Sequence, residues 1–270
     1  MASLTPAASA SSSGLAGERR ERPETPLKSS VQEALRLLEE AERRGVALRL
    51  LGGLAFYLRC PSAKISGLAR TYGDIDVMGR QKESRQIRRL FADLGYAPRE
   101  RFNALQGFRR LIFEDPENQR RVDVFLDVFE MCHKFDFSER LELDRYTLPL
   151  ADLLATKLQV VEITAKDMKD AIALLLDHDV GHGGDSPVNG ERIASLCAAD
   201  WGVYRTFTLN LDKLISQAKE CGLTGDEQRL VVGRIEQLGG IIEAAPKGRG
   251  WRMRASVGDR VRWYQLPEET

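Results

Sequence analysis

Two short segments alternate polar and apolar residues with a period of two, and this pattern strongly limits what the chain can fold into. The first is residues 74–78 (Asp-Ile-Asp-Val-Met), and the second is residues 121–128. Successive side chains of a strand point to opposite faces, so Asp74 and Asp76 share one face of the first strand. In the second strand, Asp123 lies opposite a valine face. The sequence therefore predicts two strands that each present carboxylates on one face.

These carboxylates suggest a metal site if the two strands are neighbours in one sheet. Asp74, Asp76 and Asp123 would then converge, and like charges that close repel one another unless a cation lies between them. Carboxylates suit Mg²⁺, and two such ions can clamp the attacking and leaving oxygens of an in-line displacement. Simple solvation of exposed aspartates remains the alternative for Asp74 and Asp76, and it is the favoured interpretation for Asp127.

A pair of glycines precedes these strands. Gly52 and Gly53 lie where a predicted strand over residues 46–51 gives way to a helix over residues 54–58. Glycines let the backbone approach a ligand, and a helix N-terminus offers unpaired N–H groups to phosphate. A tight turn would explain the same two residues equally well. The glycines indicate a ligand site only because they occur in the order strand, glycines, helix and carboxylates.

The remaining pattern predicts an α/β (α+β) fold, with a small mixed sheet flanked by helices followed by a mainly helical C-terminal domain. We expect a disordered tail at 1–27, an α/β domain at 28–148 and a helical domain at 149–270. The expected elements are a helix from a capping box at Ser30 to Gly45, a helix at 83–94, a hairpin of 111–113 with 122–128, helices at 150–161, 168–176, 191–198, 211–220 and 224–244, and a terminal hairpin of 251–255 with 260–265.

Composition excludes several classes of protein. The 270 residues are 43% apolar, and 40 basic residues balance 40 acidic ones, so no global field draws the chain to nucleic acid or to membranes. No apolar run is long enough to span a bilayer. Four widely spaced cysteines indicate free thiols, and the Ala- and Ser-rich N-terminus lacks the pattern of a secretory signal. We therefore expect a cytoplasmic protein with no membrane partner.

The order of these motifs resembles the DNA polymerase β-type nucleotidyltransferase superfamily. Residues 51–55 and 70–76 carry a Gly-Gly turn and an Asp-hydrophobic-Asp strand, and residues 122–124 supply a distal third carboxylate. Residues 153–158 and 166–170 are similar to one branch, the nucleotidyltransferase toxins of abortive-infection toxin–antitoxin systems and their relatives. The resemblance spans residues 46 to 176.

Membership of this superfamily would imply a site with defined parts. Two Mg²⁺ ions would lie on Asp74, Asp76 and Asp123, and these three residues with Lys157 would be catalytic. The nucleoside triphosphate would be held by residues that match the family's motifs: Gly52, Gly53, Arg70, Asp167 and Asp170. A solvated lysine on an amphipathic helix remains an equal interpretation of Lys157.

The resulting hypothesis is a Mg²⁺-dependent nucleotidyltransferase. It would transfer a nucleoside monophosphate from an NTP to an acceptor hydroxyl on RNA (including tRNA), a protein or a small molecule, and release pyrophosphate. The toxin-like branch would add an antitoxin protein as a partner. Two alternatives stay open: a catalytically silent nucleotide- or RNA-binding module, and a metal-dependent nuclease that uses the same carboxylates.

Two further clusters have less specific interpretations. Arg109 and Arg110 are expected to face Arg120 and Arg121 across the hairpin, where they would either meet an anion or remain solvated. The arginines of the predicted terminal hairpin could follow a phosphate backbone, although a hairpin packed by its tryptophans is the simpler interpretation. Residues 177–185 (DHDVGHGGD) are interpreted as a helix end and loop, not a metal site.

Overall fold

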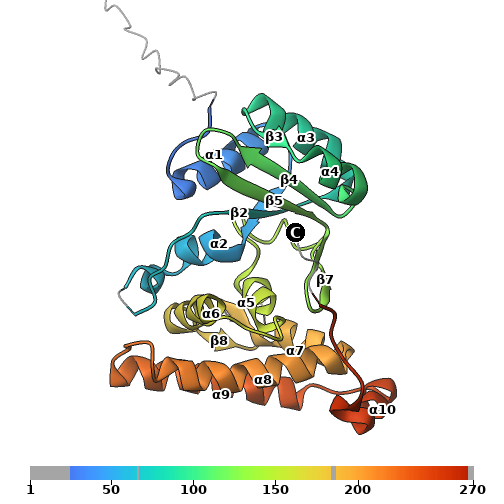
Figure 1. The fold of residues 1–270 in the computed structure, drawn as a ribbon. Coiled ribbons are helices and arrows are strands. Elements are labelled where there is room, and N and C mark those ends of the chain that lie inside the picture. The colour runs from blue at the N-terminus through green and yellow to red at the C-terminus, as the bar shows by residue number, and fades with distance from the viewer. Residues whose placement is uncertain (1–24, 66, 184–186, 267–270) are drawn as a thin grey trace, which may run out of the picture.

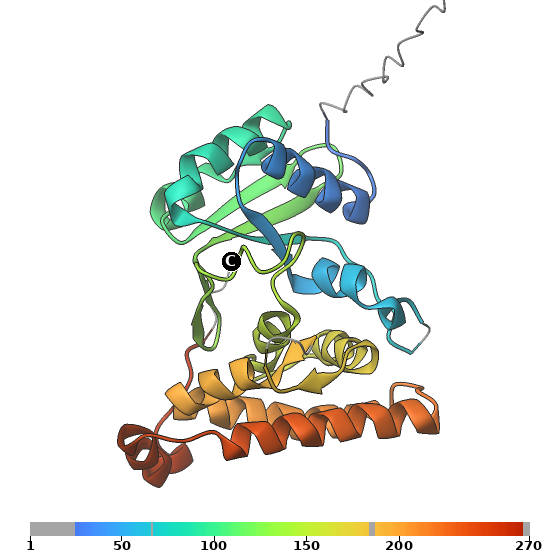
Figure 2. The ribbon, with the colours of Figure 1, turned by 180° about the vertical axis from the view of Figure 1, so that it is seen from behind.

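The computed structural model describes residues 25–65, 67–183 and 187–266 and confirms the mixed α/β class. Most of the predicted tail at 1–27 lies outside the described residues, as do the last residues of the segment 177–185. The N-terminal part is built on a five-stranded sheet, and helices make up most of the remainder (Figures 1 and 2).

The sheet has the strand order β1-β2-β5-β4-β3, and only the central β2–β5 pair is parallel. Its strands are β1 (Leu48–Leu51), β2 (Ile75–Gly79), β3 (Ala97–Pro98), β4 (Arg110–Asp115) and β5 (Arg120–Leu126). The helices of this part are α1 (Ser30–Arg43), α2 (Gly52–Arg59), η1 (Pro61–Lys64), η2 (Gln81–Glu83), α3 (Ser84–Asp93) and α4 (Glu100–Gln106). A separate hairpin joins β6 (Val128–Glu130) to β7 (Lys134–Asp136).

The apolar face of the sheet forms the core beneath α1 and α3. Ile75 pairs with Val122 and Val77 with Val124, so the apolar positions predicted from the alternation share one face. Phe113 of β4 lies on the same face, and its ring stacks on Phe91 of α3 with the centroids 4.3 Å apart. The opposite face carries the aspartates and is turned toward α2, α5 and α6 (Figure 1).

The C-terminal part consists mainly of helices. They are α5 (Leu150–Leu158), α6 (Ala165–Asp177), α7 (Gly190–Ala199), α8 (Trp201–Ala218), α9 (Gly225–Ala244) and α10 (Arg249–Val257), with a parallel pair of short strands, β8 (Val180–Gly181) and β9 (Val188–Asn189), and a final turn η3 (Gly258–Arg260). The long helices α8 and α9 lie at the base of the molecule (Figures 1 and 2). The division near residue 148 stays a prediction.

The predicted terminal hairpin is wrong, because residues 249–257 form helix α10. The two tryptophans do not pack on each other across a hairpin, since each is anchored on a different helix. Trp251 donates from Nε1 to the carbonyl of Cys197 in α7, and Trp263 donates to Thr206 Oγ1 in α8. The alternation of arginine with apolar residues was too short to distinguish a strand from a helix.

Other boundaries also differ from prediction. Ser29, not Ser30, caps α1, since its side chain accepts from the Gln32 N–H. Helix α8 begins at Trp201 rather than near residue 211, because the Asp200 carboxylate accepts from the N–H groups of Gly202 and Val203 and starts the helix there. The sequence prediction omitted α4 and the β6–β7 hairpin. Thr224 and Glu227 form a capping box at the start of α9.

All four cysteines are buried and free, as predicted. In the part of the chain that the structure covers, no helix is both long and apolar enough to cross a membrane.

Candidate active site

The centre of the candidate site is a pair of aspartates on the two parallel strands. Asp76 of β2 and Asp123 of β5 are register partners, so both side chains leave the same face of the sheet. Neighbouring strands are about 4.8 Å apart, which places the two carboxylates side by side. Asp123 is fully buried, whereas Asp76 is only half-buried. Asp74 precedes β2 and is exposed.

The glycine pair lies directly against Asp76. Gly52 is the first residue of α2 and adopts φ +65°, a left-handed conformation that favours glycine. A Cβ on Gly52 would lie 2.0 Å from Asp76 Oδ2, and one on Gly53 would lie 2.1 Å from Arg70 Nη2. Both positions favour glycine because the side chains of Asp76 and Arg70 occupy the space of a Cβ. Helix α2 begins here, so its first N–H groups, which have no partner within a helix, lie at this position.

Replacement of Gly52 should therefore cause a large loss of activity and only a small loss of unfolding free energy. In Gly52→Ala, the new methyl group must displace the Asp76 carboxylate, and a misplacement of about 1 Å can cost on the order of 100-fold in rate. Gly45→Ala is the matched control, because Gly45 has φ +69° but nothing within 4 Å of its Cβ position. Both variants should lose about 1–2 kcal/mol of unfolding free energy, and only Gly52→Ala should lose turnover. Equal turnover in the two variants would contradict this role of Gly52.

A buried ion-pair network lies beside the glycines. Asp170 of α6 is almost completely buried and accepts from Arg70 Nη2 at 2.6 Å and from Lys157 Nζ at 2.9 Å. Lys157 also donates to Asp167 at 2.8 Å. Burial lowers the pKa of Lys157, but the charges of Asp170 and Asp167 outweigh that effect and raise it, so the lysine is held in its charged form.

This network brings together residues that are far apart in the sequence. Arg70 precedes β2, Lys157 lies on α5 and Asp170 lies on α6, yet they form one cluster at the N-terminus of α2. The arginine also lies over the Tyr72 ring, with its guanidinium 4.1 Å from the ring centroid. The network holds two cations near the N-terminus of α2, where a polyphosphate would have to share them with Asp170 and Asp167.

Two arginines flank Asp123, which corrects a prediction. Arg110 and Arg121 do not face each other as repelling surface charges. Arg110 pairs in register with Phe125, and Arg121 pairs with Glu114. Arg110 Nη2 lies 2.8 Å from Asp123 Oδ1, and Arg121 Nε lies 2.8 Å from Asp123 Oδ2.

The other two arginines of that prediction are also paired with carboxylates. Arg120 binds Asp115 at 2.7 Å, and Arg109 lies 3.6 Å from Glu130. The prediction failed because the hairpin register sets Arg120 opposite Asp115 and Arg110 opposite Phe125. The turn that fixes this register includes Gln119, which adopts φ +52°.

One oxygen of Asp123 lacks a hydrogen bond despite these two arginines. Asp123 Oδ2 forms an ion pair with Arg121 Nε, but among the described residues neither atom has a hydrogen-bond partner. Arg110 binds Oδ1 and orients the carboxylate, so Oδ2 has no hydrogen bond to lose. A buried oxygen of this kind is suited to a metal ion or to a substrate hydroxyl.

The environment of Asp76 opposes its charge. Burial and the neighbouring charge of Asp123 raise the pKa of Asp76 to about 6, although Lys157 and Arg110 act in the opposite direction. A cation between the two carboxylates would remove this repulsion. Among the described residues, however, no three His, Cys, Asp or Glu side chains are already grouped as a metal site. A divalent ion would be held by Asp76 and by Asp123 Oδ2, with exposed Asp74 as an additional ligand.

The raised pKa of Asp76 has a measurable effect on stability. An aspartate whose pKa is higher in the folded state makes the protein less stable as the pH rises from about 4 to about 6. Asp76→Asn removes this penalty and should raise the free energy of unfolding at pH 7 by up to about 3 kcal/mol, but not at pH 4. Urea denaturation of both proteins at the two pH values, without metal, measures the difference. An equal effect at both pH values would contradict the assignment.

Sequence reasoning missed the role of Arg110. It is the first residue of β4 and lies in an arginine-rich stretch, where solvation is the usual expectation. The period-two pattern does place Arg110 two residues before Ile112, the register partner of Asp123, but the register itself comes only from the folded hairpin.

Comparisons with known proteins give weak structural similarities, among them two to antibiotic-resistance proteins. No family model and no curated protein sequence matches the chain. A lincosamide antibiotic adenylyltransferase, LnuA, in its lincomycin-bound form superposes with a TM-score of 0.40 at 14% identity, covering 55% of this chain and 98% of LnuA. The antibiotic-resistance factor ANT(2'')-Ia superposes with a TM-score of 0.36 at 12% identity, covering 53% of this chain and 81% of its own.

Proposed function

We propose that the chain is a Mg²⁺-dependent nucleotidyltransferase that transfers a nucleoside monophosphate from an NTP to an acceptor hydroxyl and releases pyrophosphate. The observation that carries the proposal is the juxtaposition of Asp76, Asp123 and the Gly52 turn. Burial and the charge of Asp123 raise the pKa of Asp76 there, and Gly52 leaves the space that the Asp76 carboxylate occupies.

The parts of the site follow the order of the strands. The glycine turn lies at the end of β1, Asp76 is on β2 and Asp123 is on β5. A triphosphate would lie over the N-terminus of α2, with Arg70 and Lys157 close to its charges. Asp76 and Asp123 would hold Mg²⁺, which would neutralise charge that develops on the transferred phosphoryl group.

The chain's own residues have distinct tasks in this reaction. Gly52 and Gly53 fix the position of the phosphates, and Lys157 compensates negative charge on the departing pyrophosphate. Arg110 on Oδ1 would hold the Asp123 carboxylate in place as a metal ligand, and the proton of the attacking hydroxyl would pass to water. The oxygen of the acceptor then forms a bond to the α-phosphorus as the bond to pyrophosphate breaks.

Incubation with each labelled NTP, Mg²⁺ and a cell extract tests the proposal. The enzyme should release pyrophosphate and label one class of acceptor, which also decides among RNA, protein and small molecules. NTP binding without pyrophosphate would support the silent binding module. Cleavage of nucleic acid without any NTP would support the nuclease.

The toxin role remains part of this proposal. It rests on the similarity of residues 153–158 and 166–170 to the abortive-infection branch. The buried contacts of Lys157 with Asp167 and Asp170 agree with a shared role for those motifs. Growth arrest on expression, relieved in Asp76→Asn, would support that role, and an antitoxin would then be a neighbouring gene product.

A further inference from the structure

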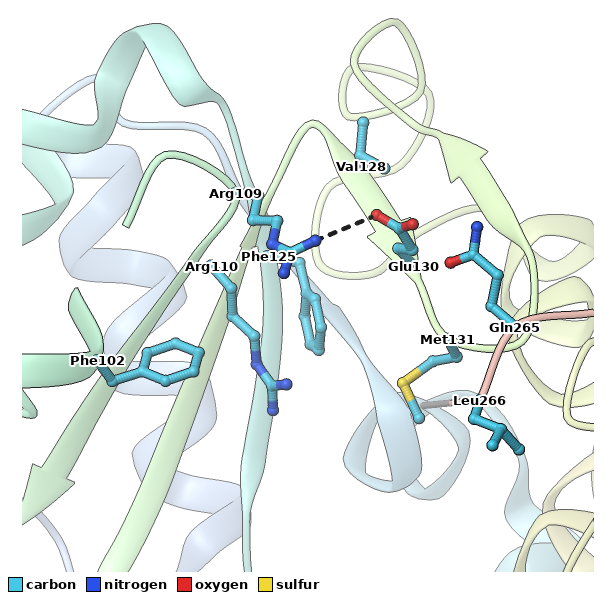
Figure 3. A pocket seen from close by; sticks show the side chains of 9 residues that line it. All are labelled: Phe102, Arg109, Arg110, Phe125, Val128, Glu130, Met131, Gln265 and Leu266. Carbon is cyan, nitrogen blue, oxygen red and sulfur yellow. Dashed lines mark ion pairs between the residues drawn. The ribbon is translucent and has the colours of Figure 1, made fainter. Parts of the chain in front are cut away.

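A cavity lies next to the candidate site, on the same face of the sheet as Asp123. It lies over β5 and β4, whereas the glycine turn lies at the end of β1. It has a volume of about 170 Å³. Its walls come from Phe102 of α4, Arg110 of β4, Phe125 of β5 and Met131 after β6, and Leu266 of the C-terminal segment completes it (Figure 3). That segment returns from α10 past β7, where the Gln265 N–H donates to the Cys132 carbonyl (Figure 1).

The position of the cavity relates it to the proposed reaction. Phe125 is two residues beyond Asp123 on the same strand, so their side chains share a face and their Cα atoms are about 7 Å apart. Arg110 both lines the cavity and hydrogen-bonds Asp123. Across the sheet, the order is therefore the glycine turn, the carboxylates and then this cavity, which places the cavity where an acceptor would approach Asp123.

The charged groups of the cavity are already compensated. Arg109 is paired with Glu130, which Figure 3 marks with a dashed line, and Arg110 is paired with Asp123. An anionic ligand would have to compete with these carboxylates, and a cationic ligand would have to displace an arginine. The cavity is therefore best matched by an uncharged group.

Its lining favours a flat ring. The guanidinium of Arg110 lies 4.8 Å from the centroid of Phe125 and 5.9 Å from that of Phe102. Aromatic rings and a guanidinium plane are surfaces on which another ring stacks. The size is suitable for a single ring, since an apolar cavity of about 150 Å³ takes up benzene.

We propose that this cavity is the acceptor subsite, and that it recognises an uncharged aromatic ring carrying the hydroxyl that is modified. The proposal rests on the nucleotidyltransferase function above. It favours a small ring-bearing acceptor, or an exposed ring of a larger one, over recognition of phosphate groups.

Ligand-observed NMR on the full chain tests the site with benzyl alcohol as the probe and benzoate as its charged counterpart. Benzyl alcohol should bind weakly, as expected for so few atoms, and benzoate should bind less well. Met131→Trp, which fills the cavity, should weaken benzyl alcohol binding by at least about tenfold. Leu105→Trp is the matched control, because Leu105 is an exposed residue of α4 outside the cavity, and it should leave binding unchanged.

A second measurement separates this subsite from the proposed function. With Mn²⁺ and ATP present, the paramagnetic ion should broaden the ring signals of bound benzyl alcohol in wild type and not in Met131→Trp, while calorimetry shows equal ATP binding in both. If ATP does not bind, the measurement is repeated with the other NTPs, and failure of all four to bind would overturn the proposed function. ATP binding with no benzyl alcohol binding, with stronger binding of benzoate, or without broadening of the ring signals would overturn the acceptor subsite.

Discussion

Asp76→Asn should lower nucleotide transfer by at least about 1,000-fold while the protein stays folded. Asn keeps the size of the side chain but removes the charge that would hold Mg²⁺ beside Asp123. Because the pKa of Asp76 is raised by burial and by Asp123, its loss also relieves repulsion, and stability at neutral pH should not fall. Pyrophosphate release with each NTP, measured beside a circular dichroism melt, gives both results.

Asp127→Asn is the matched control for this variant. Asp127 follows β5, and its φ of +59° is a conformation that Asn also tolerates. It belongs to the alternation that predicted the site, but we assign it no catalytic task, so turnover should stay at the wild-type level. Full turnover in Asp76→Asn, or equal loss in both variants, would show that the Asp76–Asp123 pair is not the reaction centre.

Asp170→Ala should produce the largest loss of stability among the site variants. Asp170 is 2% exposed and compensates both Arg70 and Lys157. Its removal leaves two nearly buried cations without that partner, and breaking such a network costs about 3–5 kcal/mol. For a chain of this size, the expected fall in Tm is about 10 °C. Differential scanning calorimetry at neutral pH measures it.

Asp226→Ala provides the comparison for this result. Asp226 also forms an ion pair, with Arg229, but both side chains are largely exposed, so its loss should leave Tm unchanged. A small effect at Asp170 would mean that Lys157 and Arg70 are solvated or paired otherwise. In that case, they would not be preorganised for a triphosphate.

The local sequence pattern was sufficient to predict much of the sheet and the residues of part of the candidate site. The alternation correctly predicted which side chains share a face in residues 75–78 and 121–126, because the period of a strand is two regardless of its neighbours. It fails at Asp127, whose φ of +59° ends the strand. The alternation could not predict that β2 and β5 pair in parallel with Asp76 opposite Asp123. That register depends on hydrophobic contacts between segments more than 40 residues apart.

The same limit explains the errors. The arginines of the β4–β5 hairpin were assigned to facing pairs because their counter-charges could not be located without the register. Residues 251–265 were assigned to a hairpin because short runs of arginine and tryptophan fit either period. Packing of Trp251 on α7 and of Trp263 on α8 favours the helix instead.

By itself, the sequence determined the secondary-structure periods, the carboxylates and the glycine turn, since each depends on nearest neighbours and backbone sterics. Only the tertiary structure decided that Arg110 orients Asp123, that Asp170 joins Arg70 to Lys157, and that a cavity opens beside Phe125. These contacts join segments distant in the chain. Their partners are chosen by burial, because a charge removed from water must find an opposite charge, wherever in the sequence that charge lies.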